Sequence, residues 1–212
     1  MRWNESSRRQ FLASSAASAA AFAIAARAPW AFGADKAQGG DPAAAPLEHR
    51  RFGNTDMDVA VLGFGAAEIG YLATDAATVE QLLNGALDSG LNVVDTAECY
   101  AESETLIGNA IGKRRKDYYL FTKCGHWTDA GRGADWSKRG LLNSIERSLK
   151  RLGTDVIDLV QLHSCSLEEL KKGECIAALE QAKKDGKTRY IGYSGDREAA
   201  RHAVECGKFD SL

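Results

Sequence analysis

The segment LLNSIERSLKRLGTDVIDLVQLH, residues 141–163, decides the fold class because a helix pattern in it leads directly into a strand pattern. The apolar residues of its first half fall on one helical stripe, and these are Leu141, Leu142, Ile145, Leu149 and Leu152. Gly153 follows as a helix-ending residue, and Val156 to Leu162 is the pattern of a buried strand. Such a unit is typical of a parallel β/α protein.

The same alternation continues along the chain in both directions. Strands are expected at residues 59–65, 92–96, 118–123, 156–162 and 189–194, after a short strand or hairpin at 47–52. Helices are expected at about 78–89, 106–111, 141–152, 167–184 and 198–206, and residues 209–212 begin a sixth strand. An open doubly wound sheet and a parallel (β/α)8 barrel both agree with this count.

Two motifs suggest a dinucleotide fold but do not carry it. Gly63-x-Gly65 follows a strand, but position 68 is Glu68 instead of a third glycine, and no helix is expected to begin directly at the glycines. Tyr119-x-x-x-Lys123 has the spacing of short-chain dehydrogenases, which need both side chains on a helix, whereas this segment is a strand pattern.

Ionisable residues stand at the ends of three successive strands. Asp95 ends one strand with Tyr100 just beyond it, Lys123 ends the next, and His163 follows the third. In a β/α barrel such strand ends meet at one mouth, where catalytic groups gather. Singly, they could be a helix cap, rim packing, a solvated strand end and a core imidazole. Their joint placement predicts a catalytic site.

The motifs around these residues carry a family resemblance. They are Asp95-Thr96-Ala97-x-x-Tyr100, Ser103-Glu104-x-x-Ile107-Gly108, Phe121-Thr122-Lys123, Leu159-Val160-Gln161-Leu162-His163 and Ile191-Gly192-Tyr193-Ser194. In this order and spacing, residues 47–212 resemble the aldo/keto reductases. The resemblance implies a (β/α)8 TIM barrel, which this sequence would leave truncated after about five and a half β/α units. Such a fragment is expected to bind nicotinamide cofactor poorly.

The resemblance also assigns roles to the four residues. It implies reduction of an aldehyde or ketone, with Tyr100 as the proton donor. Lys123 is expected to lower the pKa of that phenol, Asp95 to keep Lys123 charged, and His163 to orient the carbonyl oxygen. The alternative is a catalytically weak barrel that acts as a cofactor-sensing regulatory module.

The expected cofactor is NADPH, with NADH not excluded. The resemblance places Gly65, Ala66, Asp95 and Ser194 at the cofactor. One departure affects this part of the site: Ser194-Gly195 stands where the family usually has Ser-Asn, so one hydrogen bond to the nicotinamide carboxamide is lost or supplied elsewhere.

The first residues read as a targeting segment. Ser7-Arg8-Arg9-Gln10-Phe11-Leu12 and the apolar run that follows resemble a twin-arginine export signal at residues 1–34, and 35–46 reads as a flexible linker. This predicts contact with the twin-arginine export machinery, a periplasmic location and no stable membrane span after signal removal. The alternative is an Ala-rich helix or disordered arm.

Composition excludes other classes. The formal net charge of -2 provides no basic field for nucleic acid. The five cysteines form no C-x-x-C pair or Cys/His ligand pattern, so we expect neither a metal site nor a disulfide framework.

Overall fold

The computed structural model describes residues 46–127 and 133–212, which lie within one compact unit. The expected export signal at 1–34 and all but the last residue of the expected linker at 35–46 lie outside the described residues. Within the described part, no helix is both long and apolar enough to cross a membrane.

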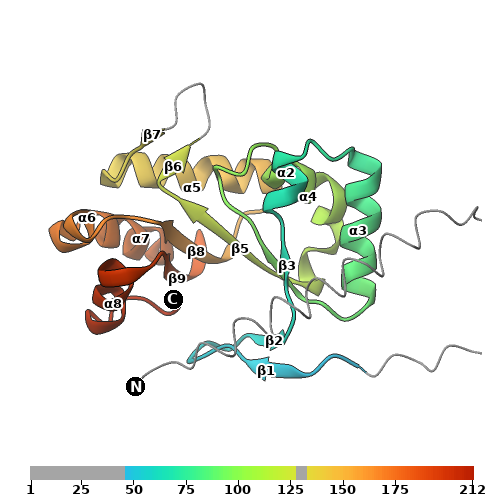
Figure 1. The fold of residues 1–212 in the computed structure, drawn as a ribbon, viewed down its shortest axis with the longest axis horizontal. Coiled ribbons are helices and arrows are strands. Elements are labelled where there is room, and N and C mark those ends of the chain that lie inside the picture. Colours follow the sequence, from blue (N-terminus) through green and yellow to red (C-terminus); the bar gives the residue numbers. More distant parts are fainter. Residues whose placement is uncertain (1–45, 128–132) are drawn as a thin grey trace, which may run out of the picture. The chain divides into compact units, whose positions relative to one another are not determined.

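A parallel sheet forms the centre of the fold (Figure 1). Its strands in spatial order are β3 (Phe64–Gly65), β4 (Val93–Asp95), β5 (Tyr119–Cys124), β8 (Ile157–His163) and β9 (Thr188–Ser194). This order follows the chain without a reversal, whereas a doubly wound sheet reverses at a switch point. Ser211 forms a parallel bridge with Gly192, so the chain after the last helix returns beside β9, where a sixth strand was expected.

Helices pack along the sheet, and the first four contact one another in chain order (Figure 1). They are α3 (Ala76–Asp88), α4 (Ser103–Ile111), α5 (Lys138–Leu152), α7 (Glu174–Lys184) and α8 (Arg197–Glu205). Alternate strand residues such as Val94, Leu120, Val160 and Ile191 enter the large apolar core that these helices share. Because strand side chains alternate between faces, the intervening residues, Asp95 and Lys123 among them, face the other way.

A hairpin covers part of that other face. Its strands β1 (His49–Arg51) and β2 (Asp58–Ala60) pair antiparallel. Met57 and Val59 of the hairpin form a second, smaller core with Phe121 and Leu159 of the sheet. The hairpin therefore covers part of the sheet face that carries Asp95 and Lys123, which we call the inner face. It covers this face on the amino-terminal side of the strand ends that carry the ionisable residues.

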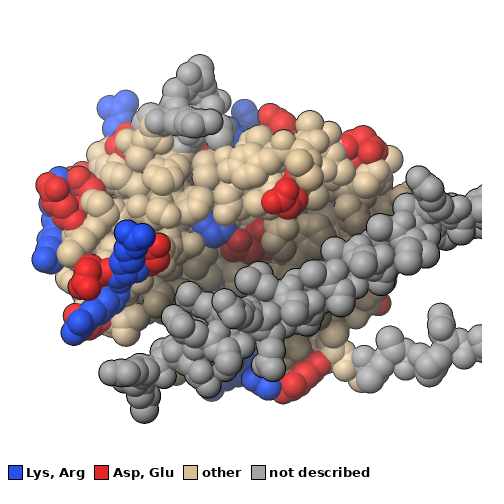
Figure 2. Space-filling model, in the orientation of Figure 1, with Lys and Arg blue, Asp and Glu red and all other residues tan. Residues whose placement is uncertain are grey.

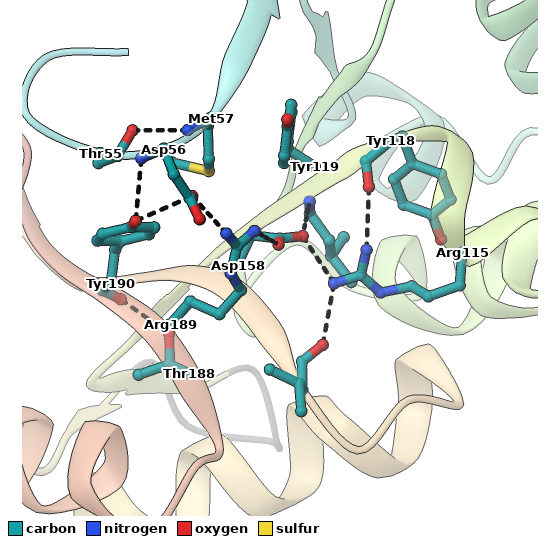
Figure 3. A network of polar contacts seen from close by, with 12 residues as sticks. Thr55, Asp56, Met57, Arg115, Tyr118, Tyr119, Asp158, Thr188, Arg189 and Tyr190 are labelled. Carbon is teal, nitrogen blue, oxygen red and sulfur yellow. Dashed lines mark hydrogen bonds and ion pairs between the residues drawn. The ribbon is translucent and has the colours of Figure 1, made fainter. Parts of the chain in front are cut away.

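A buried carboxylate links this hairpin to the sheet (Figure 3). Asp158, only 4% exposed, accepts hydrogen bonds from Arg115 at 2.7 Å and from Arg189 at 2.8 Å. Arg189 also pairs with Asp56 in the hairpin turn, and the Tyr190 hydroxyl donates to the Asp56 carboxylate at 2.9 Å. A buried charge with several donors is satisfied, so Asp158 stabilises the contacts of β8 with Arg115 and with Arg189 of β9, and Arg189 extends the network to the exposed hairpin turn.

Two expected elements are divided. The run 59–65 is not one strand, because Val59 belongs to the hairpin and Phe64 to the parallel sheet, and exposed Val61 and Leu62 connect them. The expected helix 167–184 is two helices, α6 (Leu167–Lys172) and α7, because Gly173 adopts a left-handed conformation with φ of 77°.

Four short elements are additional to those expected. A 3-10 helix, η1 (Gly112–Asp117), precedes β5, and strands β6 (His126–Trp127) and β7 (Gly133–Ala134) form a hairpin after it. Helix α2 (Ala67–Tyr71) begins two residues after Gly65, so the expectation that no helix starts there is wrong. Since a helix does follow the glycines, it is the strand order, which has no reversal, that excludes the dinucleotide-binding fold.

Candidate active site

The structure brings the four expected catalytic residues to one edge of the sheet. Asp95 is the last residue of β4, Lys123 lies one residue before the end of β5, and His163 ends β8. Tyr100 lies in the loop between β4 and α4. Since the strands are parallel and adjacent, their carboxyl ends meet, and each side chain can reach its neighbours.

Lys123 is the buried cation of the site. Its side chain is 7% exposed, its ammonium forms an ion pair with Asp95, and it donates to the Thr96 carbonyl at 2.8 Å. These partners offset the cost of removing the charge from water. Burial raises the pKa of Asp95, and the neighbouring Lys123 charge partly opposes that rise.

Tyr100 lies between this ion pair and the histidine. The Lys123 ammonium is 5.0 Å from the centroid of the Tyr100 ring, and the rings of Tyr100 and His163 meet edge-on at 5.7 Å. Burial is the largest cause that raises the pKa of Tyr100, and the negative charge of Asp95 adds to it. Desolvation is the largest influence on this pKa, so the phenol keeps its proton at neutral pH. That Lys123 lowers the pKa relative to a site without its charge stays a prediction.

Contacts with Ser103 and with helix α2 fix the loop that carries Tyr100. Ser103, fully buried, donates to the Ala66 carbonyl at 2.7 Å and lies 2.9 Å from the Thr96 hydroxyl. A Cβ added at Gly70 would lie 2.0 Å from the Tyr100 carbonyl oxygen, so helix α2 can approach this loop only with glycine there. Helix α2 and Ser103 at the start of helix α4 thus position Tyr100, and no sequence pattern connected them.

His163 is neutral at physiological pH. Burial, with the nearby charges of Lys123 and His126, lowers its pKa to about 4. Its Nδ1 lies 3.2 Å from the Cys99 sulfur, and the tilted His126 ring has its centroid 5.5 Å from that of His163. Sequence reasoning did not assign His126 to the site because the hairpin that carries it has no strand pattern.

Gln161 is a further polar residue on the inner face. It pairs in register with Lys123 and lies two residues before His163, so strand alternation places all three on one side of the sheet. Its side chain is largely buried. The period-2 pattern of β8 would have identified it from the sequence.

The residues expected at the cofactor lie along the same edge. Gly65 pairs with Asp95 and is exposed, and Ser194 ends β9 opposite His163. Ala66 is fully buried, and its N–H already donates to the Asp95 carbonyl at 2.8 Å. Of the adjacent residues Gly65 and Ala66, Gly65 is therefore the one whose surface is accessible.

The structure explains the glycine after Ser194. A Cβ at Gly195 would lie 2.4 Å from the hydroxyl of Tyr193, which is buried and donates to the Cys165 carbonyl at 2.8 Å. Any larger residue would have to displace that ring. Position 195 therefore cannot hold asparagine while Tyr193 keeps this place.

Charge is distributed without a dominant sign. Among the described residues on the face drawn in Figure 2, basic and acidic side chains are interspersed and form no continuous basic surface. Residues 46–127 and 133–212 also contain no group of three His, Cys, Asp or Glu side chains arranged to hold a metal ion.

Fold and site together define an α/β protein with a polar site of Asp, Tyr, Lys and His at the carboxyl edge of a parallel sheet. The sequence pattern of the aldo/keto reductase family matches residues 61–208. This chain therefore belongs to the aldo/keto reductase family.

Individual relatives agree with this assignment. The chain is 36% identical over 156 residues to the oxidoreductase YqkF of Bacillus subtilis, covering 71% of this chain and 50% of the relative. It is 34% identical to L-galactose dehydrogenase of Arabidopsis thaliana (70% and 49% covered) and 33% identical to methylglyoxal reductase YeaE of Escherichia coli (66% and 46% covered). The chain thus spans about half the length of these curated relatives.

Solved structures show the same similarity. An aldo-keto reductase from Pseudomonas aeruginosa superposes with a TM-score of 0.70 at 34% identity, covering 74% of this chain and 63% of that one. The holo form of an aldo-keto reductase from Bacillus halodurans gives a TM-score of 0.66 at 35% identity, covering 71% and 51%.

Proposed function

We propose that this protein reduces the carbonyl group of small aldehydes or ketones with a nicotinamide cofactor. The observation that carries the proposal is the placement of a protonated phenol, Tyr100, between the buried Lys123–Asp95 pair and a neutral His163. Carbonyl reduction needs a proton donor at the carbonyl oxygen, and the Tyr100 phenol provides that proton. The Lys123 ammonium then stabilises the phenolate that remains.

Each residue has a separate task. Tyr100 donates its proton to the carbonyl oxygen. The Lys123 ammonium stabilises the phenolate that remains, since a cation close to a phenol favours its charged form. Asp95 holds the ammonium in place, and His163 orients the carbonyl oxygen through a hydrogen bond.

The residues at the strand ends fit a nicotinamide. When bound, this group supplies the hydride that the carbonyl carbon receives. The exposed edge at Gly65 leaves open space, since a Cβ there would meet no atom within 4 Å. Ser194 lies opposite His163 and offers a hydroxyl for the carboxamide. We propose NADPH as the physiological cofactor, on the family resemblance alone.

The substrate class follows from the relatives and the site. Two relatives are named for methylglyoxal reduction and L-galactose dehydrogenation, so we propose a small, polar carbonyl compound. The polar groups beside Lys123 and His163, namely Gln161 and His126, favour such a substrate over a long apolar one.

We also propose that the sheet is part of a (β/α)8 barrel. Sequential strand order supports it, as does the parallel bridge of Ser211 to Gly192, which begins a further strand. The inner hairpin would then cover the amino-terminal end of the barrel, opposite the site.

For the first residues we propose export by the twin-arginine route to the periplasm. The Arg8-Arg9 pair and the apolar run after it support this assignment. A reporter fused after Pro46 should reach the periplasm, and the double change Arg8→Lys and Arg9→Lys should retain it in the cytoplasm. Unchanged export of the double variant would contradict the proposal.

An absorbance assay of the full-length protein tests the catalytic proposal. With NADPH and methylglyoxal, we expect cofactor oxidation that depends on enzyme and aldehyde together. A fluorescence titration with NADPH measures binding separately. Tight binding without oxidation across a panel of aldehydes and ketones would contradict the reductase assignment.

A further inference from the structure

Cys99 contacts the histidine of the site from the loop that also carries Tyr100. Its sulfur lies 3.2 Å from Nδ1 of His163, across 64 positions of sequence. The Cys99 carbonyl accepts a hydrogen bond from the Tyr71 hydroxyl at 3.3 Å, which ties this loop to helix α2. Cys99 is therefore held in place at the back of the imidazole.

The chemistry of the two groups sets the direction of this contact. A neutral imidazole has one N–H donor and one strong acceptor nitrogen, whereas a thiol is a weak donor and its sulfur a weak acceptor. The favoured arrangement has the S–H donate to Nδ1, because the imidazole nitrogen is the better acceptor. Burial raises the pKa of Cys99, and the pKa of His163 is about 4, so thiol and neutral imidazole coexist at physiological pH.

We propose that Cys99 is a positioning residue that holds His163 in the tautomer protonated at Nε2. Nδ1 is then occupied as an acceptor, and the only N–H of the ring is at Nε2. This inference rests on the proposed function, in which that N–H donates to the carbonyl oxygen of the substrate. The loop β4–α4 would thus supply both the proton donor, Tyr100, and the group that orients the histidine.

Other groups around His163 do not offer Nδ1 the same contact. Lys123 directs its ammonium to Asp95 and to the Thr96 carbonyl. His126 meets His163 ring to ring, with centroids 5.5 Å apart. Among residues 46–127 and 133–212, the hydrogen-bond partner of the His163 ring is Cys99.

Nitrogen-15 NMR of histidine side chains in the full-length protein tests the tautomer directly. His163→Gln assigns the resonance. We expect wild type to show an unprotonated Nδ1 and a protonated Nε2, Cys99→Ala to shift toward a mixture, and Cys99→Ser to keep the wild-type pattern. A wild type protonated at Nδ1, or a Cys99→Ala spectrum identical to wild type, would overturn the proposal. This readout does not depend on turnover.

Steady-state kinetics test the consequence. Cys99→Ala should lower kcat and kcat/KM together by about two- to tenfold, the range for one net hydrogen bond, and Cys99→Ser should recover most of the loss. Cys206→Ala, at the end of α8, is the matched control and should leave kcat unchanged. A changed tautomer with unchanged kcat would overturn the positioning role, and an inactive wild type would instead refute the proposed reductase function. Thermal melts check that each variant is folded.

Discussion

The Lys123 ammonium lies 5.0 Å from the centroid of the Tyr100 ring and is held there by Asp95. This relationship places a buried cation beside a phenol that still keeps its proton, because burial raises the pKa of Tyr100. Proton donation is then favoured at the moment when the phenolate forms, since its charge is stabilised by a cation already in position.

Changes to the ion pair should separate the two partners. Lys123→Met removes the charge that stabilises the phenolate and should lower kcat by at least about tenfold, whereas Asp95→Asn acts only through Lys123 and should have an intermediate effect. Asp95→Asn should also lower the melting temperature, because it leaves a buried ammonium without its counter-charge. Lys116→Met, at an exposed position of η1, is the control. Equal kcat for Lys123→Met and wild type would contradict this role.

His163 should make stability depend on pH. Its pKa is about 4 in the folded protein against an ordinary value of 6.5, so between these values the unfolded chain binds a proton that the folded chain does not. The contribution of neutral His163 is full above about pH 6.5 and is lost as pH falls toward 4. Melting temperatures from pH 4 to 7.5 should fall less for His163→Gln than for wild type, with His202→Gln as the control. Parallel curves would contradict the burial of His163.

Asp158 should contribute far more to stability than Asp56, although both bind Arg189. Asp158→Asn leaves Arg115 and Arg189 without their buried counter-charge and should reduce the free energy of unfolding by about 3–5 kcal/mol. Asp56→Asn removes an exposed partner and should change it little. Urea unfolding measures both. Similar losses would show that the buried Asp158 carboxylate contributes no more to stability than the exposed Asp56.

Gly195 should not tolerate a side chain. Gly195→Ala places a Cβ against the Tyr193 ring and should destabilise the fold by about 1–3 kcal/mol. Gly112→Ala is the matched control, since its φ of -56° suits alanine and its Cβ would meet no atom within 4 Å. Equal stability of the two variants would refute the packing argument for the missing asparagine.

The sequence predicted the elements whose pattern is long and periodic. Helix α5 and strand β8 lie almost where residues 141–163 indicated, and the strand ends brought Asp95, Lys123 and His163 together, because parallel strands share an edge. Short elements were missed: α2 has only five residues, and β6 and β7 have two each, too few for a period to be read.

Contacts across the chain were beyond sequence reasoning. The Cys99–His163 contact joins two segments that no local pattern relates, and the raised pKa of Tyr100 depends on burial that only packing determines. The division of 59–65 reflects a tertiary demand, since Val59 is needed in the hairpin core and Phe64 beside β4. A glycine at position 173 is a helix-ending signal, so the break within 167–184 could have been predicted from the sequence.

The turnover number of Tyr100→Phe beside that of Tyr71→Phe tests the central claim most directly. Both tyrosines lie at the site, their rings 5.5 Å apart, but only Tyr100 is placed as the proton donor. In the full-length protein with NADPH and methylglyoxal, Tyr100→Phe should lower kcat by at least about a hundredfold while NADPH binding stays near wild type, and Tyr71→Phe should keep most of its turnover. Wild-type turnover by Tyr100→Phe would contradict the account.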